Sequence, residues 1–174
     1  MKTASISAFE DDITNCITET NHTLIEVFDC YDCTPSQQRS YIKTEENQPT
    51  HFILHNDGQT DLVFAALDNC MLKSHNQSVC DFLIGNFKKL YFVEIKQVNR
   101  GQRSLARTNA IQQLNSSLSF FRKRINLTNK ALKAVICLKA NKVHPLQSAT
   151  RTANFFAFKE THNASLMEGQ SHTF

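Results

Sequence analysis

The sequence is poor in the residues that break or loosen a fold. Its 174 residues include only four glycines, three prolines and no tryptophan. This scarcity excludes a collagen-like or linker-rich chain. No stretch approaches the ~18 consecutive apolar residues of a membrane-spanning helix, and residues 1–12 lack the charged segment followed by an apolar run that marks a secretory signal. We therefore expect a cytoplasmic protein with no membrane partner.

Acidic residues are scarce in the second half of the chain. Residues 1–80 hold 4 Lys/Arg and 12 Asp/Glu, whereas residues 81–174 hold 15 Lys/Arg and 4 Asp/Glu, for a formal net charge of +3. Such an asymmetry suggests that the second half faces a polyanion such as nucleic acid. The alternative is that the two halves neutralise each other within one fold.

The chain has six cysteines, at positions 16, 30, 33, 70, 80 and 137. Without a secretory signal we expect these thiols to be reduced. Cys30 and Cys33 have the spacing of half a zinc site, but no second close pair follows them. A structural zinc is therefore an alternative to ordinary buried or surface thiols.

The pattern of apolar residues predicts a mixed α/β fold in a single domain covering residues 1–174, of which 41% are hydrophobic. A helix is expected over residues 5–18, and residues 29–50 read as a loop with at most one helical turn. A longer helix is expected over residues 104–125, where apolar residues recur at steps of three and four. The predicted strands cover residues 52–54, 62–72, 79–84, 89–98, 132–138 and 155–158. The tail after residue 160 is expected to be poorly ordered.

One predicted strand carries charges on an apolar face. In residues 89–98, Glu94 and Lys96 share a face with Leu90 and Phe92, because alternate residues of a strand point the same way. Burying charge is costly unless it is paired or bound to a metal. The segment therefore reads as the wall of a cleft, and the alternative is a plain Glu94–Lys96 ion pair.

A second carboxylate lies in the preceding predicted strand. Asp81 would be laid beside Glu94 by a hairpin through residues 85–88. Two neighbouring carboxylates form a hard oxygen site suited to Mg²⁺. The ammonium of Lys96 could hold a water molecule or stabilise charge on a phosphate.

An Asp, a hairpin and then Glu94-Ile95-Lys96 resemble the motif of the PD-(D/E)xK nuclease superfamily. The resemblance extends to Ala110-Ile111-Gln112-Gln113-Leu114, which is similar to an Ala-x-x-Gln-Leu element that often follows in that superfamily. Cys80 stands where the motif has proline. The resemblance implies a restriction-endonuclease-like core over residues 62–140: a three-stranded antiparallel meander and a further strand, flanked by helices.

The resemblance also implies roles for individual residues. Asp81 and Glu94 would bind Mg²⁺, with Mn²⁺ as a substitute, Lys96 would be the catalytic lysine, and Gln113 would orient the water or the site. Glu10 on the N-terminal helix would complete the metal site, with Asp68 as a weaker candidate. Basic residues that flank the site in sequence are expected to contact the phosphate backbone: Lys88, Lys89, Arg100, Arg103 and Arg107.

These observations predict a Mg²⁺-dependent deoxyribonuclease. The small size and the lack of an added recognition domain suggest a homodimer or a subunit of a larger system. The resemblance to the superfamily implies a role in bacterial defence or DNA processing. Two alternatives stay open. One is a catalytically inactive module of the same fold that binds nucleic acid or protein, and the other is a zinc-stabilised interaction protein built around Cys30 and Cys33.

Overall fold

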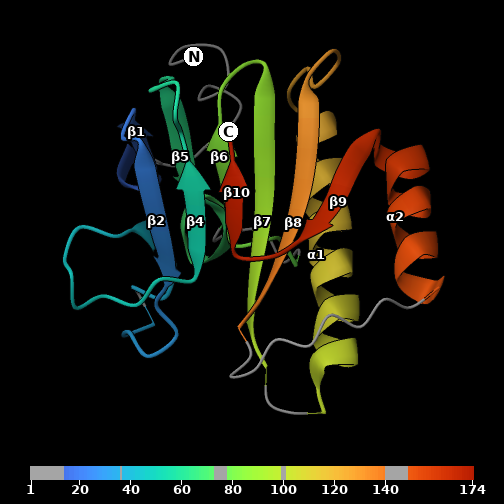
Figure 1. Cartoon of the computed structure of the whole chain (residues 1–174), viewed down its shortest axis with the longest axis horizontal. Coiled ribbons are helices and arrows are strands. Elements are labelled where there is room, and N and C mark those ends of the chain that lie inside the picture. The colour runs from blue at the N-terminus through green and yellow to red at the C-terminus, as the bar shows by residue number, and fades with distance from the viewer. Residues whose placement is uncertain (1–13, 36, 73–77, 99–100, 140–148) are drawn as a thin grey trace.

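The structure is a computed structural model that describes residues 14–35, 37–72, 78–98, 101–139 and 149–174. It contains two mixed β-sheets (Figure 1). The large sheet has six strands in the order β1 (Ile17–Thr20), β5 (Leu62–Ala66), β6 (Phe82–Gly85), β7 (Lys89–Gln97), β8 (Ala131–Lys139) and β9 (Ala164–Glu168). The small sheet has four strands in the order β10 (Ser171–Thr173), β4 (Phe52–His55), β2 (Leu24–Asp29) and β3 (Ser40–Ile42).

The large sheet is covered on both faces. Helix α1 (Arg103–Arg122) lies behind it in Figure 1, and the small sheet lies in front. Alternate residues of β7 serve the two sides: Leu90 and Phe92 join a core cluster with α1, whereas Val93 and Ile95 join a second cluster with the small sheet. Helix α2 (Ala149–His162) packs beside β9 and adds Phe158 to the first cluster. A strand covered on both faces is apolar on both, as the sequence of β7 shows.

The strands around the predicted motif run as the hairpin pattern predicts. β5, β6 and β7 pair antiparallel in chain order. After β7 the chain crosses through α1 to β8, which pairs parallel to β7. The predicted helix over residues 104–125 and the strands over 89–98 and 132–138 are thus confirmed within a few residues.

Several predictions for the two ends of the chain are wrong. Residues 5–13 of the predicted N-terminal helix, including Glu10, lie outside the described residues. Residues 14–20 are not helical beyond a short 3₁₀ turn (Thr14–Cys16), because β1 pairs with β5. The predicted strand over 155–158 lies within α2, where the rings of Phe158 and His162, four residues apart, are in contact. The tail after residue 160 is ordered, because β9 pairs with β8 and β10 pairs with β4.

Two other segments also differ from the sequence-based expectation. The predicted loop over residues 29–50 contains β3, which pairs with β2. The apolar run over 62–72 breaks after Ala66 into a wide turn (Leu67–Met71), in which Asn69 has a positive φ of 54°.

Four of the six cysteines form disulfides, so the expectation of reduced thiols is wrong for these four. Cys16 pairs with Cys70, and Cys30 pairs with Cys33. Cys80 and Cys137 are buried free thiols. With their sulfurs bonded to each other, Cys30 and Cys33 are not available as zinc ligands, so the zinc-based alternative loses its basis.

Within the described ranges, no helix is long and apolar enough to cross a membrane.

Candidate active site

The hairpin between β6 and β7 fixes the relative position of the two predicted carboxylates. Phe82 is the register partner of Val93, and this register, continued by one residue, sets Asp81 opposite Glu94. The backbone of Asp81 is held from the other side as well, because its carbonyl accepts a hydrogen bond of 2.8 Å from the N–H of Leu67. The structure therefore brings Asp81 and Glu94 together.

Glu94 is fully buried, and its carboxylate has a positively charged neighbour at only one of its two oxygens. Its side chain is 0% exposed, and the Nζ of Lys96 lies 2.5 Å from its Oε1. Its Oε2 has no hydrogen-bond partner in the described part of the chain. The Oδ2 of Asp81, in contrast, accepts a hydrogen bond of 2.5 Å from the N–H of Ile95. Glu94 thus presents an unsatisfied carboxylate oxygen, which is costly inside a protein.

Asp81 and Lys96, but not Glu94, line a small pocket of about 170 Å³. It lies where β2, β5 and β7 end and where β6 begins. Its polar walls include the carboxylates of Asp29, Asp68 and Asp81, the ammonium of Lys96 and the amide of Gln113. The remaining lining residues are Cys30, Tyr31, Gln38, Asn69 and Ile95.

Burial dominates the electrostatics of this pocket. It raises the pKa of Glu94 to about 8, although the neighbouring Lys96 acts to lower that pKa. Burial also raises the pKa of Asp81 well above its ordinary value, and the charges of Glu94 and Asp29 raise it further. The pKa values of Asp29 and Asp68 are raised by burial too. Burial acts to lower the pKa of Lys96, but the carboxylate of Glu94 outweighs this effect and the pKa rises. The pocket and its surroundings therefore crowd four carboxyl groups around one ammonium and disfavour their ionised forms.

Helix α1 fixes the segment that carries Asp81. The Nε2 of Gln113 donates a hydrogen bond of 3.0 Å to the carbonyl of Val79. One turn later, the Oγ of Ser117 accepts a hydrogen bond of 2.7 Å from the N–H of Cys80. Gln113 lines the pocket and also holds the backbone just before Asp81.

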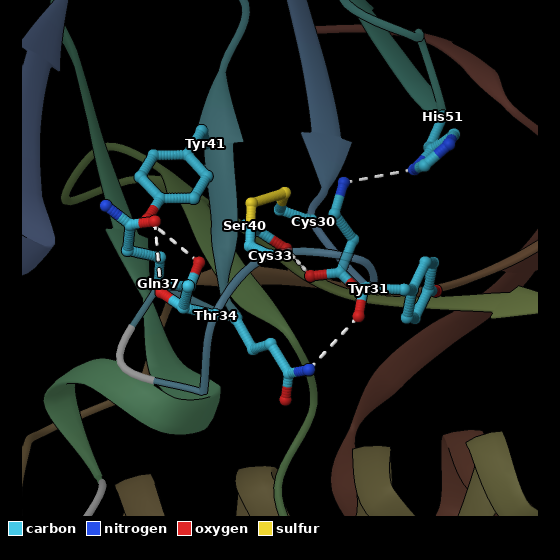
Figure 2. The surroundings of a disulfide bond; sticks show 10 residues. Cys30, Tyr31, Cys33, Thr34, Gln37, Ser40, Tyr41 and His51 are labelled. Carbon is cyan, nitrogen blue, oxygen red and sulfur yellow. Dashed lines mark hydrogen bonds between the residues drawn. A yellow bond between two sulfur atoms is a disulfide. The ribbon is translucent and has the colours of Figure 1, made fainter.

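The small sheet supplies the opposite wall of the pocket. Asp29 is the last residue of β2, and its N–H donates a hydrogen bond of 3.0 Å to Nδ1 of His51. The next residues form the Cys30–Cys33 disulfide, with Tyr31 and His51 close by (Figure 2). The hydroxyl of Tyr31 donates a hydrogen bond of 3.0 Å to the carbonyl of Ile95 on β7. This contact ties the end of β2 to the strand that bears Glu94 and Lys96.

The structure does not gather all the residues predicted to contact nucleic acid. Lys89 is the first residue of β7 and lies ~17 Å along the strand from Glu94, so Lys88 and Lys89 are at the other end of the sheet. Arg103 and Arg107, on the first turns of α1, both form ion pairs with Glu168 on β9. Glu10 and Arg100 lie outside the described residues.

Sequence reasoning missed Asp29, Tyr31 and Ser117, and it treated Asp68 as a minor candidate. Asp29 had one visible signal: it follows Ile25 and Val27 at steps of two, so it continues the inward face of β2. No signal in the sequence shows that this strand belongs to a second sheet whose end meets the end of β7.

The oxygen donors of the pocket suit a hard divalent cation such as Mg²⁺. Within the residues that the structure describes, no group of three or more His, Cys, Asp or Glu side chains is arranged so that it could hold a metal ion. The buried, unpartnered Oε2 of Glu94 nevertheless fits a cation. Lys96, whose side chain is 28% exposed, would have to move away from Glu94 before an ion could take its place.

Comparison of the chain with models of known families, with curated proteins and with solved structures found no match. The assignment of a function therefore rests on the residues of this pocket.

Proposed function

We propose that the chain is a Mg²⁺-dependent nuclease that hydrolyses phosphodiester bonds in DNA. One observation carries the proposal: the β6–β7 register sets Asp81 opposite Glu94, next to Lys96, and Glu94 has a buried oxygen without a hydrogen-bond partner among the described residues. The antiparallel β5–β6–β7 unit followed by α1 and the parallel strand β8 supports a restriction-endonuclease-like core.

Each residue of the site has a separate role in the proposed hydrolysis. Asp81 and Glu94 would hold the ion, which when bound polarises a phosphoryl oxygen and lowers the pKa of a bound water molecule. Lys96, released from Glu94, orients the attacking water and stabilises the negative charge that develops on the phosphate. Gln113 positions Asp81 through the carbonyl of Val79. A pocket of about 170 Å³ has room for a phosphate group but not for a whole nucleotide, so the bases would lie outside it.

The second candidate function is a non-catalytic binding module with the same fold. The direct contact between Lys96 and Glu94 favours the binding module, because a structural ion pair explains the presence of both charged side chains without a metal or catalysis. The two candidates differ in one property: only the nuclease cleaves DNA in a way that depends on a metal and on these side chains.

The test is a cleavage assay on linear, circular and single-stranded DNA, with RNA in parallel, in the presence of Mg²⁺, Mn²⁺ or EDTA. We expect the natural protein to cleave DNA with Mg²⁺ or Mn²⁺ and to be inactive in EDTA. Asp81→Asn, Glu94→Gln and Lys96→Ala should each reduce the rate by ~100-fold or more, because each removes a group that stabilises the transition state. Asp61→Asn, at an exposed carboxylate just before β5, is the control and should keep full activity.

No cleavage of any DNA by the natural protein with either metal would overturn the nuclease and leave the binding module. Cleavage that survives Asp81→Asn would place the chemistry elsewhere. Cleavage of RNA alone would overturn the choice of DNA as substrate.

A further inference from the structure

Four lysines gather at the end of the large sheet where β7 and β8 begin, opposite the end at which the pocket lies (Figure 1). Lys88 precedes β7 and Lys89 begins it, while Lys130 precedes β8 and Lys133 is its third residue. Because the two strands pair in parallel, with Lys89 opposite Ala131, both bring their lysines to the same end. The carbonyl of Lys88 accepts a hydrogen bond of 2.8 Å from the N–H of Ala131, which sets Lys88 beside Lys130. These four residues form the lysine cluster.

The positive charge of the lysine cluster is not neutralised by the described part of the chain. None of its members forms an ion pair with a carboxylate among the described residues. Like charges on neighbouring strands repel one another, and burial together with the charge of Lys133 lowers the pKa of Lys89. The carboxylates of Glu19 and Asp61 line a hollow on the β5 side of the hairpin. The surface on the β8 side therefore concentrates positive charge, which attracts a polyanion.

An exposed aromatic ring lies beside these lysines. Phe87, in the β6–β7 hairpin, is 63% exposed. The Nζ of Lys88 lies 5.8 Å from the centre of its ring, and the Nζ of Lys130 donates a hydrogen bond of 2.6 Å to its carbonyl. A nucleic-acid base can stack on such a ring while the neighbouring cations contact the phosphates. Attachment to a lipid surface scales with the apolar area that inserts, and one ring offers little area, so nucleic acid is the better match.

We propose that Phe87 and the lysine cluster bind single-stranded DNA, with a base stacked on Phe87 and the lysines against the phosphates. The choice of DNA as the polyanion rests on the proposed function, whereas the surface is separate from the pocket, since Lys89 lies ~17 Å along β7 from Glu94. The surface holds the substrate at one end of β7 while a phosphodiester bond is hydrolysed near the other end.

The test measures binding without cleavage. A fluorescently labelled oligothymidylate is titrated with the protein in EDTA at several salt concentrations, and its anisotropy is followed. Lys88→Gln combined with Lys133→Gln should weaken binding ~10-fold or more at low salt. It should also reduce the slope of log affinity against log salt by ~1.4, because each phosphate contact of a single strand contributes about 0.7 to that slope. Lys43→Gln combined with Lys159→Gln, which removes two charges outside the cluster, should bind as the natural protein does.

A second variant isolates the stacking interaction. Phe87→Ala should weaken binding ~5-fold or more, as expected for the loss of one base stacked on an aromatic ring. The salt dependence should not change, because no charge is removed. Phe87→Trp, which keeps a ring for stacking, should retain the natural affinity. A loss of affinity in Phe87→Ala that comes with a changed salt dependence, or that Phe87→Trp does not restore, would show that Phe87 is structural and would overturn its role.

Other outcomes would also overturn the proposal. One is equal weakening of binding by the two double lysine variants, and another is tighter binding of duplex DNA that is indifferent to Phe87→Ala. A third is Phe87-dependent binding to phosphatidylserine vesicles without binding of DNA, which would assign the surface to a membrane.

The binding assay separates this proposal from the proposed function. Binding of the oligothymidylate by a protein that cleaves no DNA with either metal overturns the nuclease and leaves the surface intact. Metal-dependent cleavage by a protein whose affinity is unchanged in the Phe87 and cluster variants overturns the surface and leaves the nuclease intact.

Discussion

At the scale of single residues, Glu94 has the strongest influence on the chemistry of the molecule. It lies within the longest pairing in the large sheet and is fully buried. Its pKa of about 8 means that the folded protein retains a proton which the unfolded chain releases near its ordinary value of 4.5. Folding is therefore coupled to pH through this one side chain.

We predict that Glu94→Gln increases stability, and more so at alkaline pH. Because the pKa is raised in the folded state, the natural protein loses stability as the pH rises from about 4.5 to about 8. Glutamine does not ionise, so the variant lacks this loss, and its stability relative to the natural protein should rise by ~1–3 kcal/mol between pH 5.5 and pH 8.0. The measurement is urea unfolding in EDTA at pH 5.5 and 8.0. Glu46→Gln, at an exposed position, should show no such difference.

An equal effect of Glu94→Gln at both pH values would show that the carboxylate is ionised throughout this range. It would mean that Lys96, 2.5 Å away, outweighs burial.

The residues of the site that could be predicted from the sequence are those on one hairpin. Asp81, Glu94 and Lys96 follow from alternation along two neighbouring strands, and the structure places them together. Asp29 could not be placed from the sequence, because its proximity depends on how two sheets pack. Local patterns carry no information on contacts between segments ~50 residues or more apart.

At the scale of elements, the β6–β7 hairpin sets the geometry of the site. A shift of one residue in its register would move Glu94 and Lys96 to the opposite face of the sheet. Gly85 closes the hairpin with a φ of +154°, and a Cβ added there would lie 2.2 Å from the carbonyl oxygen of Lys89. The neighbouring Asn86 accepts hydrogen bonds from the N–H groups of Lys88 and Lys89.

We predict that Gly85→Ala destabilises the fold by ~2 kcal/mol or more, because the new methyl group meets backbone that cannot move away. Gly58→Ala is the matched control, since its nearest neighbour is 3.5 Å away and its φ is not in the restricted range. Chemical denaturation of both variants tests the stability. If Gly85→Ala is as stable as Gly58→Ala, the hairpin adapts and the register does not depend on this glycine.

The elements that could be predicted are those with long, regular patterns. β7, β8 and α1 each show their period over nine residues or more. The prediction failed at 155–158 because four residues do not distinguish a strand from one turn of helix. It failed for β9 and β10 because these strands are held in place by parallel pairing with β8 and β4, and their own composition does not indicate a strand.

At the scale of the whole molecule, one disulfide encloses most of the small sheet. Cys16 lies just before β1 and Cys70 in the turn after β5, 54 positions later. The loop that this bond closes contains β2, β3 and β4. The second disulfide, Cys30–Cys33, closes a loop of only three positions. The two bonds should therefore contribute very differently to stability.

We predict that replacing Cys16 and Cys70 together with serine lowers the free energy of unfolding by about 4 kcal/mol, whereas replacing Cys30 and Cys33 together lowers it by only about 2 kcal/mol. Both values follow from the entropy that each closed loop removes from the unfolded chain. Urea denaturation of the two double variants without reductant measures the difference. Equal effects, or the reverse order, would show that chain entropy does not govern the contribution of these bonds.

The strand β10 has a consequence for assembly. It lies parallel to β4, and its first pair joins Ser171 to Ile53. Pairing between strands so far apart in the sequence forms slowly compared with a hairpin. During refolding, the backbone groups at the edge of β4 therefore stay unpaired after most of the sheet has formed. A β10 segment from a neighbouring molecule fits that edge equally well, which is the route to domain-swapped dimers. The protein concentration at which the chain refolds then decides between single molecules and pairs that have exchanged their final strands.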